Sequence, residues 1–481
     1  MDLGRACVIG SGPNGLAAAI VLAQAGMRVE VFEAEAEPGG ATRTLPLTLP
    51  GFLHDFGSAV HPFAAGSPFF GSLPLADHGL EWIHGEAPLA HPLDDGTAVV
   101  MERELGETER ALGVDGKEWR RLVEPAVANW KDFAEDTLGP ALRLPHHPLR
   151  MARFGLSVLQ PARSFATNHF SSERTRAVFA GLAGHSVLSL DEPLTATIGL
   201  MFGITLHACG WPIPRGGAQA IPRALIGYLQ AISVKGGGAV HTSRRIDAAV
   251  LRELQGAGEL VLFDTTPRQL VEIAGDQISG SYRRAFSRFR PGPGAFKMDF
   301  ALSEPVPWRA GECRRAITVH LGGTLEEIAA SEDAVAHGRV AERPFVLAAQ
   351  PTLFDATRAP QGKHVLWAYC HVPNGSAVDM KERIEAQIER FAPGFRDCVL
   401  ARRVSGPAAL EKMDANLLGG DIAGGALSLR QFFLRPTLCS YSTGVQKLYL
   451  CSASTPPGGG VHGMCGYHGA KAALRKTARS S

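Results

Sequence analysis

The sequence predicts an α/β protein in which a domain with a parallel sheet is interrupted by an inserted α+β domain. Three observations favour this fold class. An apolar strand pattern at residues 6–9 leads into a glycine-rich turn and then into an alanine-rich helix pattern. A similar succession of strand, glycine run and helix recurs at residues 448–474. The chain between them has one block of mostly helical patterns and one block that mixes strands with helices.

The length and composition are those of a globular protein with more than one domain. The chain has 481 residues, 45% of them hydrophobic and 20% charged, and its formal net charge of +1 gives no reason to expect a nucleic-acid partner. None of the eight cysteines forms a Cys-x-x-Cys pair, which argues against a dithiol redox centre, and no spacing indicates a metal site. Because no secretory signal and no apolar run of about 18 residues is found, we expect a cytoplasmic protein.

The first unit has the arrangement of a dinucleotide site. The strand Ala6–Ile9 is followed by three spaced glycines, a helix pattern, a second strand pattern and Glu33 at its end. Gly10 permits the tight turn, Gly12 lets a diphosphate approach the backbone, and Gly15 lets helix and strand pack closely. The N-terminus of the helix then faces the phosphates. Glu33 is suitably spaced to bind a ribose hydroxyl pair, which disfavours a 2′-phosphorylated cofactor.

A double glycine follows this acidic residue. Gly39 and Gly40 lie within "AEAEPGGATRT", and "GFLHDFGSAVHPF" comes next. Here the sequence resembles the FAD-dependent amine oxidase and phytoene desaturase superfamily, in which the backbone after such a double glycine folds back across an extended FAD. The resemblance implies FAD rather than NAD, a Rossmann-like FAD-binding domain of the glutathione-reductase type, and a cation from Arg43 at the phosphate or flavin edge. A surface arginine is the alternative interpretation of Arg43.

The middle of the chain contains the pieces expected where it returns to the FAD-binding domain. Gly216 and Gly217 open a helix pattern to about residue 231, and "AVHTSRRIDAAV" gives a strand region. In the superfamily a residue on this strand holds the adenine through backbone atoms, and Ile246 is the best match. The next strand leads to Thr265. The interval between the two strands is too short for the small β-meander that many relatives insert there.

The stretch "PPGGGVHGMCG" is predicted to form the flavin end of the site. A strand pattern at 448–451 precedes it, and the helix is expected to start near 461–463 with its N-terminal dipole toward the flavin. Many superfamily members carry an Asp just after this strand, whereas Ser452 and Ser454 offer neutral hydrogen bonds here. The residues assigned to the cofactor are Gly10, Gly12, Pro13, Asn14, Gly15, Glu33, Ala34, Gly39, Gly40, Ala41, Thr42, Arg43, Gly57, Ser58, Ile246, Thr265, Ser452, Ser454, Gly460, Val461 and His462.

Lys297 is the first of two candidate catalytic residues. Phrases such as "GPGAFKMDFALSEPVPW" and "LLGGDIAGGALSLRQFFLRP" resemble the phytoene dehydrogenase-related branch, and the likeness spans most of the chain. In flavin amine oxidases a strand lysine followed eleven residues later by a tryptophan holds a water against flavin N5, and Trp308 follows Lys297 at that spacing. An ammonium there favours reoxidation by oxygen or movement of a proton. A strand lysine that reaches solvent is the alternative.

His462 is the second candidate. It ranks first among the histidines because it lies inside the C-terminal glycine run, beside the expected flavin, and a hydrogen bond to backbone is its alternative role. The further acid–base candidates are His61, His185, His320, His371 and His468.

These patterns set the domain boundaries and the predicted function. The FAD-binding domain is assigned to residues 1–75, 206–285 and 431–481, and the substrate-binding domain to 76–205 and 286–430. The protein is predicted to be an FAD-dependent oxidoreductase that transfers a hydride from a small organic substrate to flavin N5, with oxygen as one candidate acceptor. The family resemblance favours an apolar substrate. The alternatives are a flavin amine or amino-acid oxidase, an NAD-only dehydrogenase, and a flavin-containing scaffold protein with vestigial redox activity.

The segment "HHPLRMARFGLSVLQPARSFATNHF", residues 146–170, alternates basic and apolar residues. Such a segment can touch a membrane surface, which would suit a lipid-soluble substrate. Ordinary packing of helix, loop and helix is the alternative. The sequence leaves open whether the protein is a monomer or a homodimer.

Overall fold

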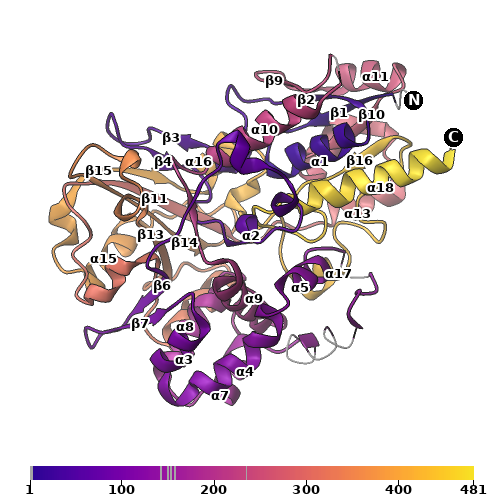
Figure 1. The fold of residues 1–481 in the computed structure, drawn as a ribbon. Coiled ribbons are helices and arrows are strands. Elements are labelled where there is room, and N and C mark those ends of the chain that lie inside the picture. The colour runs from indigo at the N-terminus through magenta and orange to yellow at the C-terminus, as the bar shows by residue number, and fades with distance from the viewer. Residues whose placement is uncertain are drawn as a thin grey trace.

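The chain folds around two sheets, one parallel and one mixed (Figure 1). The computed structural model describes residues 4–140, 143–148, 151, 154–155, 159–234 and 236–480. The parallel sheet and its helices lie on the same side of the molecule as both chain ends, and the mixed sheet with the helices of residues 105–209 forms the rest (Figure 1). The α/β fold class predicted from the sequence is confirmed.

The parallel sheet has five strands in the order β16-β10-β1-β2-β9. Neighbouring strands all run parallel, and Ile9 at the end of β1 pairs with Phe32 of β2 on one side and Phe263 of β10 on the other. The carboxyl ends of the strands therefore meet at one edge, where open α/β sheets bind their ligands. The strands are β1 (Arg5–Ile9), β2 (Arg28–Phe32), β9 (Ala239–His241), β10 (Leu260–Phe263) and β16 (Leu448–Leu450).

The mixed sheet has seven strands in the order β15-β11-β14-β13-β12-β6-β7. Strands β6 and β12 run parallel, and the other neighbouring pairs are antiparallel. The strands are β6 (Ala87–Pro92), β7 (Ala98–Met101), β11 (Gly294–Leu302), β12 (Ala316–Leu321), β13 (Val346–Ala349), β14 (His364–Val372) and β15 (Val399–Ser405). Two short ribbons complete the described strands: β3 (Thr44–Leu45) with β4 (His54–Asp55), and β5 (Trp82–Ile83) with β8 (Ile213–Pro214).

Helix α1 (Pro13–Gln24) packs against both α10 (Ala220–Ile232) and α18 (Met464–Ser480). Its residues from Asn14 to Ala23 are all buried, which accounts for a sequence that is apolar on every side. Gly466 of α18 marks a very close approach, because a Cβ at this position would lie 1.8 Å from the carbonyl oxygen of Asn14. The two glycine-rich helix starts of the sequence therefore pack against each other.

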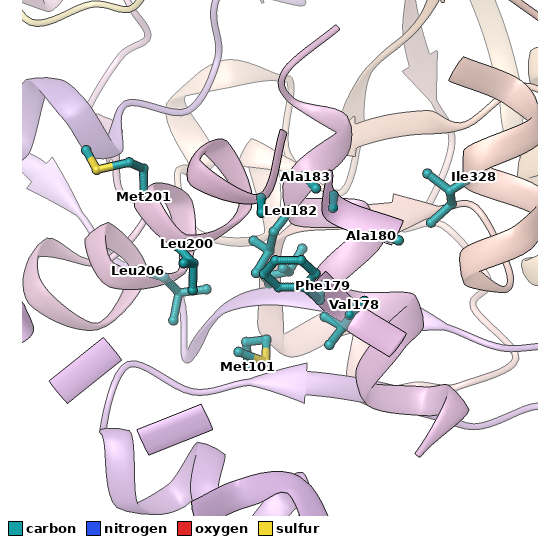
Figure 2. Packing of buried hydrophobic residues seen from close by; sticks show 14 of the residues in the cluster. Met101, Val178, Phe179, Ala180, Leu182, Ala183, Leu200, Met201, Leu206 and Ile328 are labelled. Carbon is teal, nitrogen blue, oxygen red and sulfur yellow. The ribbon is translucent and has the colours of Figure 1, made fainter. Parts of the chain in front are cut away.

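The helices of the first inserted block pack around an apolar core that is distinct from the core of the parallel sheet (Figure 2). Phe179 and Leu182 of α8 lie in one cluster with Leu200 of α9 and Met101 of β7. The helices of this block are α3 (Leu105–Ala111), α4 (Gly116–Val127), α5 (Trp130–Thr137), α7 (Ala162–His169), α8 (Glu173–Gly184) and α9 (Thr195–Cys209). The other described α-helices are α2 (Pro62–Ala65), α11 (Ala248–Gly256), α12 (Pro267–Ala274), α13 (Gly280–Ser287), α14 (Leu325–Ala336), α15 (Lys381–Phe391), α16 (Pro407–Met413) and α17 (Leu429–Phe433).

Two local expectations near the parallel sheet were wrong. The expected strand region at 239–250 ends at His241, because Asp247 caps α11 by accepting hydrogen bonds from the backbone N–H groups of Ala249 and Val250. Ile246 is therefore in the connecting loop and not on a strand. The C-terminal helix begins at Met464, just beyond the expected 461–463, because the positive φ of Gly463 (69°) keeps the preceding backbone out of the helix.

Other features of the inserted block were not foreseen. Strands β6 and β7 lie in the block expected to be mostly helical. Part of the basic and apolar segment 146–170 lies outside the described residues; its helix α7 packs inward through Phe165 and Ala166. Among the helices that the structure describes, none has the length and apolar character needed to cross a bilayer.

The contact between α18 and α1 makes a stability prediction. Gly466→Ala places a methyl group against the carbonyl of Asn14, so the helices must separate, and we expect unfolding to become easier by about 2–4 kcal/mol. Gly256→Ala in α11 is the matched control, since nothing lies within 4 Å of its added Cβ and alanine favours a helix. Urea unfolding measures both variants. Equal stability of the two would contradict the close contact.

Candidate active site

One large cavity joins the parallel sheet to the mixed sheet. Its volume is about 1130 Å³, larger than the 300–1,000 Å³ usual for a small-ligand pocket. The lining includes Gly10 and Glu33 at the carboxyl edge of the parallel sheet, and Phe202, Trp211 and Lys297 at the other end. The volume and this lining give room for an extended cofactor together with a second molecule.

The glycine turn after β1 leaves the start of α1 bare toward this cavity. Gly10 has a φ of 101°, and a Cβ on Gly15 would lie 2.2 Å from the carbonyl oxygen of Gly10. Gly12 is the N-cap of α1 and offers no side chain to its first turn, so free N–H groups remain there. The helix dipole adds positive potential at the same point, and the turn is therefore suited to an anion.

Glu33 ties this turn to the end of β2. Its Oε2 accepts hydrogen bonds from the backbone N–H of Ser11 (3.0 Å) and from the Ser11 hydroxyl (2.6 Å). Its Oε1 accepts one from the backbone N–H of Glu35 (2.9 Å). The carboxylate is buried, and its remaining lone pairs can accept from hydroxyl groups of a ligand in the cavity.

The double-glycine segment forms a neighbouring wall. The Thr42 hydroxyl donates to the carbonyl of Gly39 (2.6 Å), and Arg43 Nε donates to the carbonyl of Gly40 (2.9 Å). Arg43 is buried against the ring of Phe56, so the alternative of a surface arginine is wrong.

Gly57 and Ser58 continue this wall. A Cβ on Gly57 would lie 2.3 Å from the carbonyl oxygen of Ala41, so a larger residue does not fit there. The Ser58 hydroxyl is buried without a partner and belongs to the cavity lining. The assigned residues Pro13, Ala34, Ile246 and Thr265 line the same cavity.

His462 uses its ring to start α18. Its Nδ1 accepts the backbone N–H of Met464 (3.0 Å), and its carbonyl accepts the Ser67 hydroxyl (2.7 Å). Burial lowers the pKa of His462 to about 4, so the ring is neutral near pH 7. These contacts correspond to the alternative role given above for His462, a hydrogen bond to backbone. Gly460, Val461 and the hydroxyls of Ser452 and Ser454, which are 2.6 Å apart, line the cavity beside it.

Lys297 lies in β11 with its ammonium inside the protein. It forms an ion pair with Asp299, two residues along the same strand, and lies 5.8 Å from the ring centre of Trp367. Only 3% of its surface is exposed, so the alternative of a lysine reaching solvent is wrong. Burial shifts the pKa of Lys297 downward and that of Asp299 upward, and their mutual attraction opposes both shifts.

Trp308 is not at this site. Its indole N–H donates to Gln350 Oε1 (3.0 Å) within the core of the mixed sheet, away from the cavity lining. The aromatic neighbour of Lys297 is Trp367, whose N–H donates to the carbonyl of Gly57 (3.0 Å). The spacing of eleven residues therefore does not bring Trp308 to Lys297 as the sequence pattern implied.

The other candidate histidines separate into two groups. His61 and His185 line the cavity, and both ring nitrogens of the buried His61 lack a hydrogen-bond partner. His320 lies behind His185, at 3.0 Å between their Nε2 atoms. His371 pairs with Glu332 at 2.8 Å, and His468 bonds to the carbonyl of Leu138; neither histidine is part of the cavity lining.

Asp264 is a site residue that the sequence motifs did not indicate. It follows β10 directly, and its Oδ2 accepts the backbone N–H of Gly15 (2.8 Å) at the start of α1. Burial raises the pKa of Asp264 to about 7, with Asp414 and Glu33 contributing through their charges. Its position at the carboxyl end of a strand was the signal that could have found it.

The residues at the glycine-rich end fit a dinucleotide. At the start of α1 the N-cap Gly12 provides no side-chain acceptor and Asp264 accepts only the N–H of Gly15, while the buried polar atoms Asn14 Oδ1 and Ser58 Oγ, both of residues in the cavity lining, have no partners. A Cβ on Gly10 or Gly12 would meet Asp264, and one on Gly40 would meet Asp414, so these glycines let the cavity wall pack closely and present its backbone. No group of three or more histidine, cysteine or acidic side chains among the described residues is placed to hold a metal ion.

Comparisons with known proteins agree with this geometry. Residues 8–70 match a family of NAD(P)-binding Rossmann-like domains. The chain is 26% identical to the rat (Rattus norvegicus) pyridine nucleotide-disulfide oxidoreductase domain-containing protein 2, over 98% of this chain and 93% of that protein. It is 28% identical to the phytoene dehydrogenase of Streptomyces griseus, over 82% of this chain and 77% of the relative. The structure of putrescine oxidase bound to putrescine has the same fold, with a TM-score of 0.60, 16% identity and 100% of both chains covered.

The chain is thus similar in sequence to a phytoene dehydrogenase and similar in fold to putrescine oxidase. The resemblance inferred from its motifs is thereby confirmed. The matched Rossmann-like segment contains the end of β1, the glycine turn, α1 and β2, so the dinucleotide-binding domain rests on both sequence and fold. The likeness to putrescine oxidase is a likeness of fold, and it does not identify the substrate of this protein.

The buried carboxyl of Asp264 leads to a prediction about how the stability of this protein depends on pH. Its folded-state pKa of about 7 lies above the ordinary value of 3.8, so the folded protein holds the proton more tightly than the unfolded chain does. This contribution to stability is complete below pH 3.8 and is lost as the pH rises through about 7. Asp264→Asn keeps an acceptor for Gly15 without the titration, so it should gain up to roughly 4 kcal/mol over the wild type between pH 4 and pH 8.

Chemical unfolding across this pH range measures the difference. Asp276→Asn is the matched control, since Asp276 is fully exposed and its replacement should leave the wild-type pH dependence in place. A constant difference between Asp264→Asn and wild type at all pH values would contradict the buried proton.

Proposed function

We propose that the protein is an FAD-dependent oxidoreductase that oxidises an apolar organic substrate. The observation that carries the proposal is the single cavity: its glycine-rich end fits a dinucleotide, and its other end is an apolar chamber beside Lys297. When bound, FAD supplies the redox chemistry by accepting a hydride at its N5 atom. The protein residues would bind the cofactor, orient the substrate beside it and shield both from water.

The glycine-rich end would hold the cofactor. The N-terminus of α1, with Gly12 as its bare cap, would receive the diphosphate, and Glu33 would accept a ribose hydroxyl. Ile246 and Thr265 line the cavity on the side expected for the adenosine. The stretch from Ser452 to His462 would hold the flavin end through backbone groups and the serine hydroxyls.

Asp264 helps this end accept a negative ligand. An ionised carboxylate beside the start of α1 would repel a diphosphate, whereas burial favours its neutral form up to about pH 7. Because a bound anion favours that proton further, binding of a dinucleotide should weaken as the pH rises above the pKa of Asp264. The carboxylate is thus compatible with the proposed cofactor.

The far end of the cavity favours an apolar substrate. Phe63 and Phe202 meet edge to face at 5.0 Å, and Trp211 packs against Phe202 at 5.6 Å. These rings line the cavity with Leu347 and Met201, which leaves a surface that binds hydrocarbon by excluding water.

Lys297 would act at the boundary between the two ends. Its ammonium is held by Asp299 and faces the cavity close to Trp367. A cation so placed can stabilise negative charge that develops when the reduced cofactor meets oxygen, or hold a water that moves a proton.

An amine oxidase is the second candidate. It is favoured by an aromatic pair, Trp367 and Tyr369, whose rings lie 5.0 Å apart at 67° in the cavity wall. Such a pair can attract a substrate ammonium group. An amino-acid oxidase, an NAD-only dehydrogenase or a redox-inactive flavin scaffold are the remaining alternatives.

A cytoplasmic location and contact with a membrane surface stay predictions, and the choice between monomer and homodimer stays open.

An anaerobic screen tests the proposed function. The purified protein is mixed without oxygen with lipids, hydrocarbons, alcohols, amines and amino acids, and loss of the yellow flavin absorbance is followed. We expect apolar donors to bleach the flavin. Phe202→Ser should slow this bleaching about tenfold through lost apolar contact, while Leu438→Ser, at a side chain 74% exposed and outside this cavity, should not.

Bleaching by amines alone would favour the second candidate. Yellow protein that no donor bleaches would favour a scaffold and overturn the proposed function.

Lys297→Met tests the reaction with oxygen. The flavin is reduced without oxygen, oxygen is admitted, and the return of absorbance is timed. Loss of the ammonium should slow reoxidation about tenfold or more. Lys363→Met is the control because Lys363 is exposed in the turn that precedes β14 of the same sheet. An unchanged rate for Lys297→Met would remove this lysine from the mechanism.

A further inference from the structure

A chain of three histidines runs inward from the apolar chamber. His185 follows α8 directly and lines the chamber, with its ring stacked on Phe202 at 4.3 Å and edge-on to Trp211 at 5.6 Å. Its Nε2 lies 3.0 Å from Nε2 of His320, which is fully buried in β12. Two imidazoles at this distance share one proton, so one ring donates and the other accepts.

His91 of the neighbouring strand β6 extends the chain. The register that pairs Val319 with Ala90 places His320 and His91 one residue further along. Their Nδ1 atoms are both buried without a partner and converge on Gly181, where a Cβ would lie 2.7 Å from one and 3.3 Å from the other. Gly181 thus leaves the space in which the two rings face each other.

The far end of the chain fixes the tautomers. His91 Nε2 lies 2.7 Å from the carbonyl oxygen of Gly323, and since a carbonyl only accepts, this nitrogen carries the hydrogen. His91 Nδ1 then carries a lone pair. The two Nδ1 atoms form no hydrogen bond with each other, but a second lone pair on His320 Nδ1 would face that of His91 across the space at Gly181, and this repulsion favours a hydrogen on Nδ1 of His320. His320 Nε2 is consequently an acceptor for the N–H of His185 Nε2. With these hydrogen positions, Nδ1 of His185 has no hydrogen and is an acceptor, on the ring that borders the chamber.

Burial keeps this acceptor neutral. The pKa of His185 is lowered to about 3, with His371 adding a smaller effect, so the ring carries no charge near pH 7. The hydroxyl of Thr318, on the same face of β12 as His320, is a second polar group in the lining and has no partner. An unpaired acceptor and hydroxyl in an apolar chamber are costly unless a ligand satisfies them.

We propose that the substrate is an apolar molecule that carries a hydroxyl group, and that His185 accepts the hydrogen bond from this hydroxyl while His320 fixes the tautomer of His185. The inference rests on the proposed function, because it takes the apolar chamber as the substrate site. It specifies that function further: a hydrocarbon leaves the acceptor unpaired, and an ammonium group meets a nitrogen that cannot carry a compensating charge.

Binding to the purified, cofactor-containing protein tests the inference without turnover. Decan-1-ol, geraniol and cyclododecanol are each compared with their methyl ethers by calorimetry, since the ether keeps the oxygen and the skeleton but cannot donate. At least one alcohol should bind about tenfold more tightly than its ether. If no alcohol binds more tightly than its ether, the proposal is overturned.

Variants assign the discrimination to the histidines. His185→Phe should make alcohol and ether bind alike, and His185→Gln, which retains an acceptor, should keep part of the preference. His320→Phe should reduce the ratio while the affinity for the ether stays as in the wild type, a separation that general damage to the fold would not give. His207→Gln is the control, because His207 is a buried histidine bonded to Trp119 outside the cavity lining.

An unchanged ratio in both His185 variants would overturn the proposal, and so would an equal loss in His207→Gln. The two proposals fail separately. A protein that prefers alcohols through His185 yet is bleached by no donor retains this site and loses the proposed function. A protein whose flavin is bleached by apolar donors, but which does not prefer alcohols, retains the proposed function and loses the hydroxyl-binding site.

Discussion

The close approach of α1 and α18 is the constraint on which the site depends. At Gly466 there is no room for a Cβ beside the carbonyl of Asn14, and at Gly15 none beside the carbonyl of Gly10. The two glycine-rich helix starts, far apart in the sequence, are thereby brought to one edge of the parallel sheet. One start leaves free N–H groups toward the cavity, and the other is capped by the ring of His462. Their proximity permits one extended ligand to meet both.

Buried charges join this domain to the mixed sheet. Arg358 pairs with Asp55 at 2.8 Å, and Asp55 lies in the ribbon that follows the double-glycine segment. Lys297 pairs with Asp299, and His54 Nδ1 lies 3.7 Å from the same carboxylate. Two cations and two carboxylates thus offset each other inside the protein. Such an arrangement adds specificity more than stability, since each ion loses hydration on burial. It fixes the mixed sheet, and with it the apolar chamber, against the dinucleotide end.

The sequence predicted the parts of the site that are local in the chain. The strand, glycine turn, helix and Glu33 are consecutive, and each has its own periodicity or spacing, so this unit could be placed by residue number. The contact of Asp264 with Gly15 and the pairing of His185 with His320 could not be predicted, because these residues meet their partners only through strand order and tertiary packing. The interval of eleven residues between Lys297 and Trp308 was a poor guide for the same reason. A spacing along the chain does not determine where in the fold the second residue packs.

FAD at the glycine-rich end of the cavity is the proposal from which the roles of the other residues follow. To test it, the purified protein is denatured and the released cofactor is identified by chromatography against authentic FAD, FMN and NAD. We expect yellow protein that releases about one FAD per chain, as a non-covalent cofactor enclosed by one site should. Colourless protein that takes up no FAD on addition, or release of NAD or FMN in its place, would overturn the proposal.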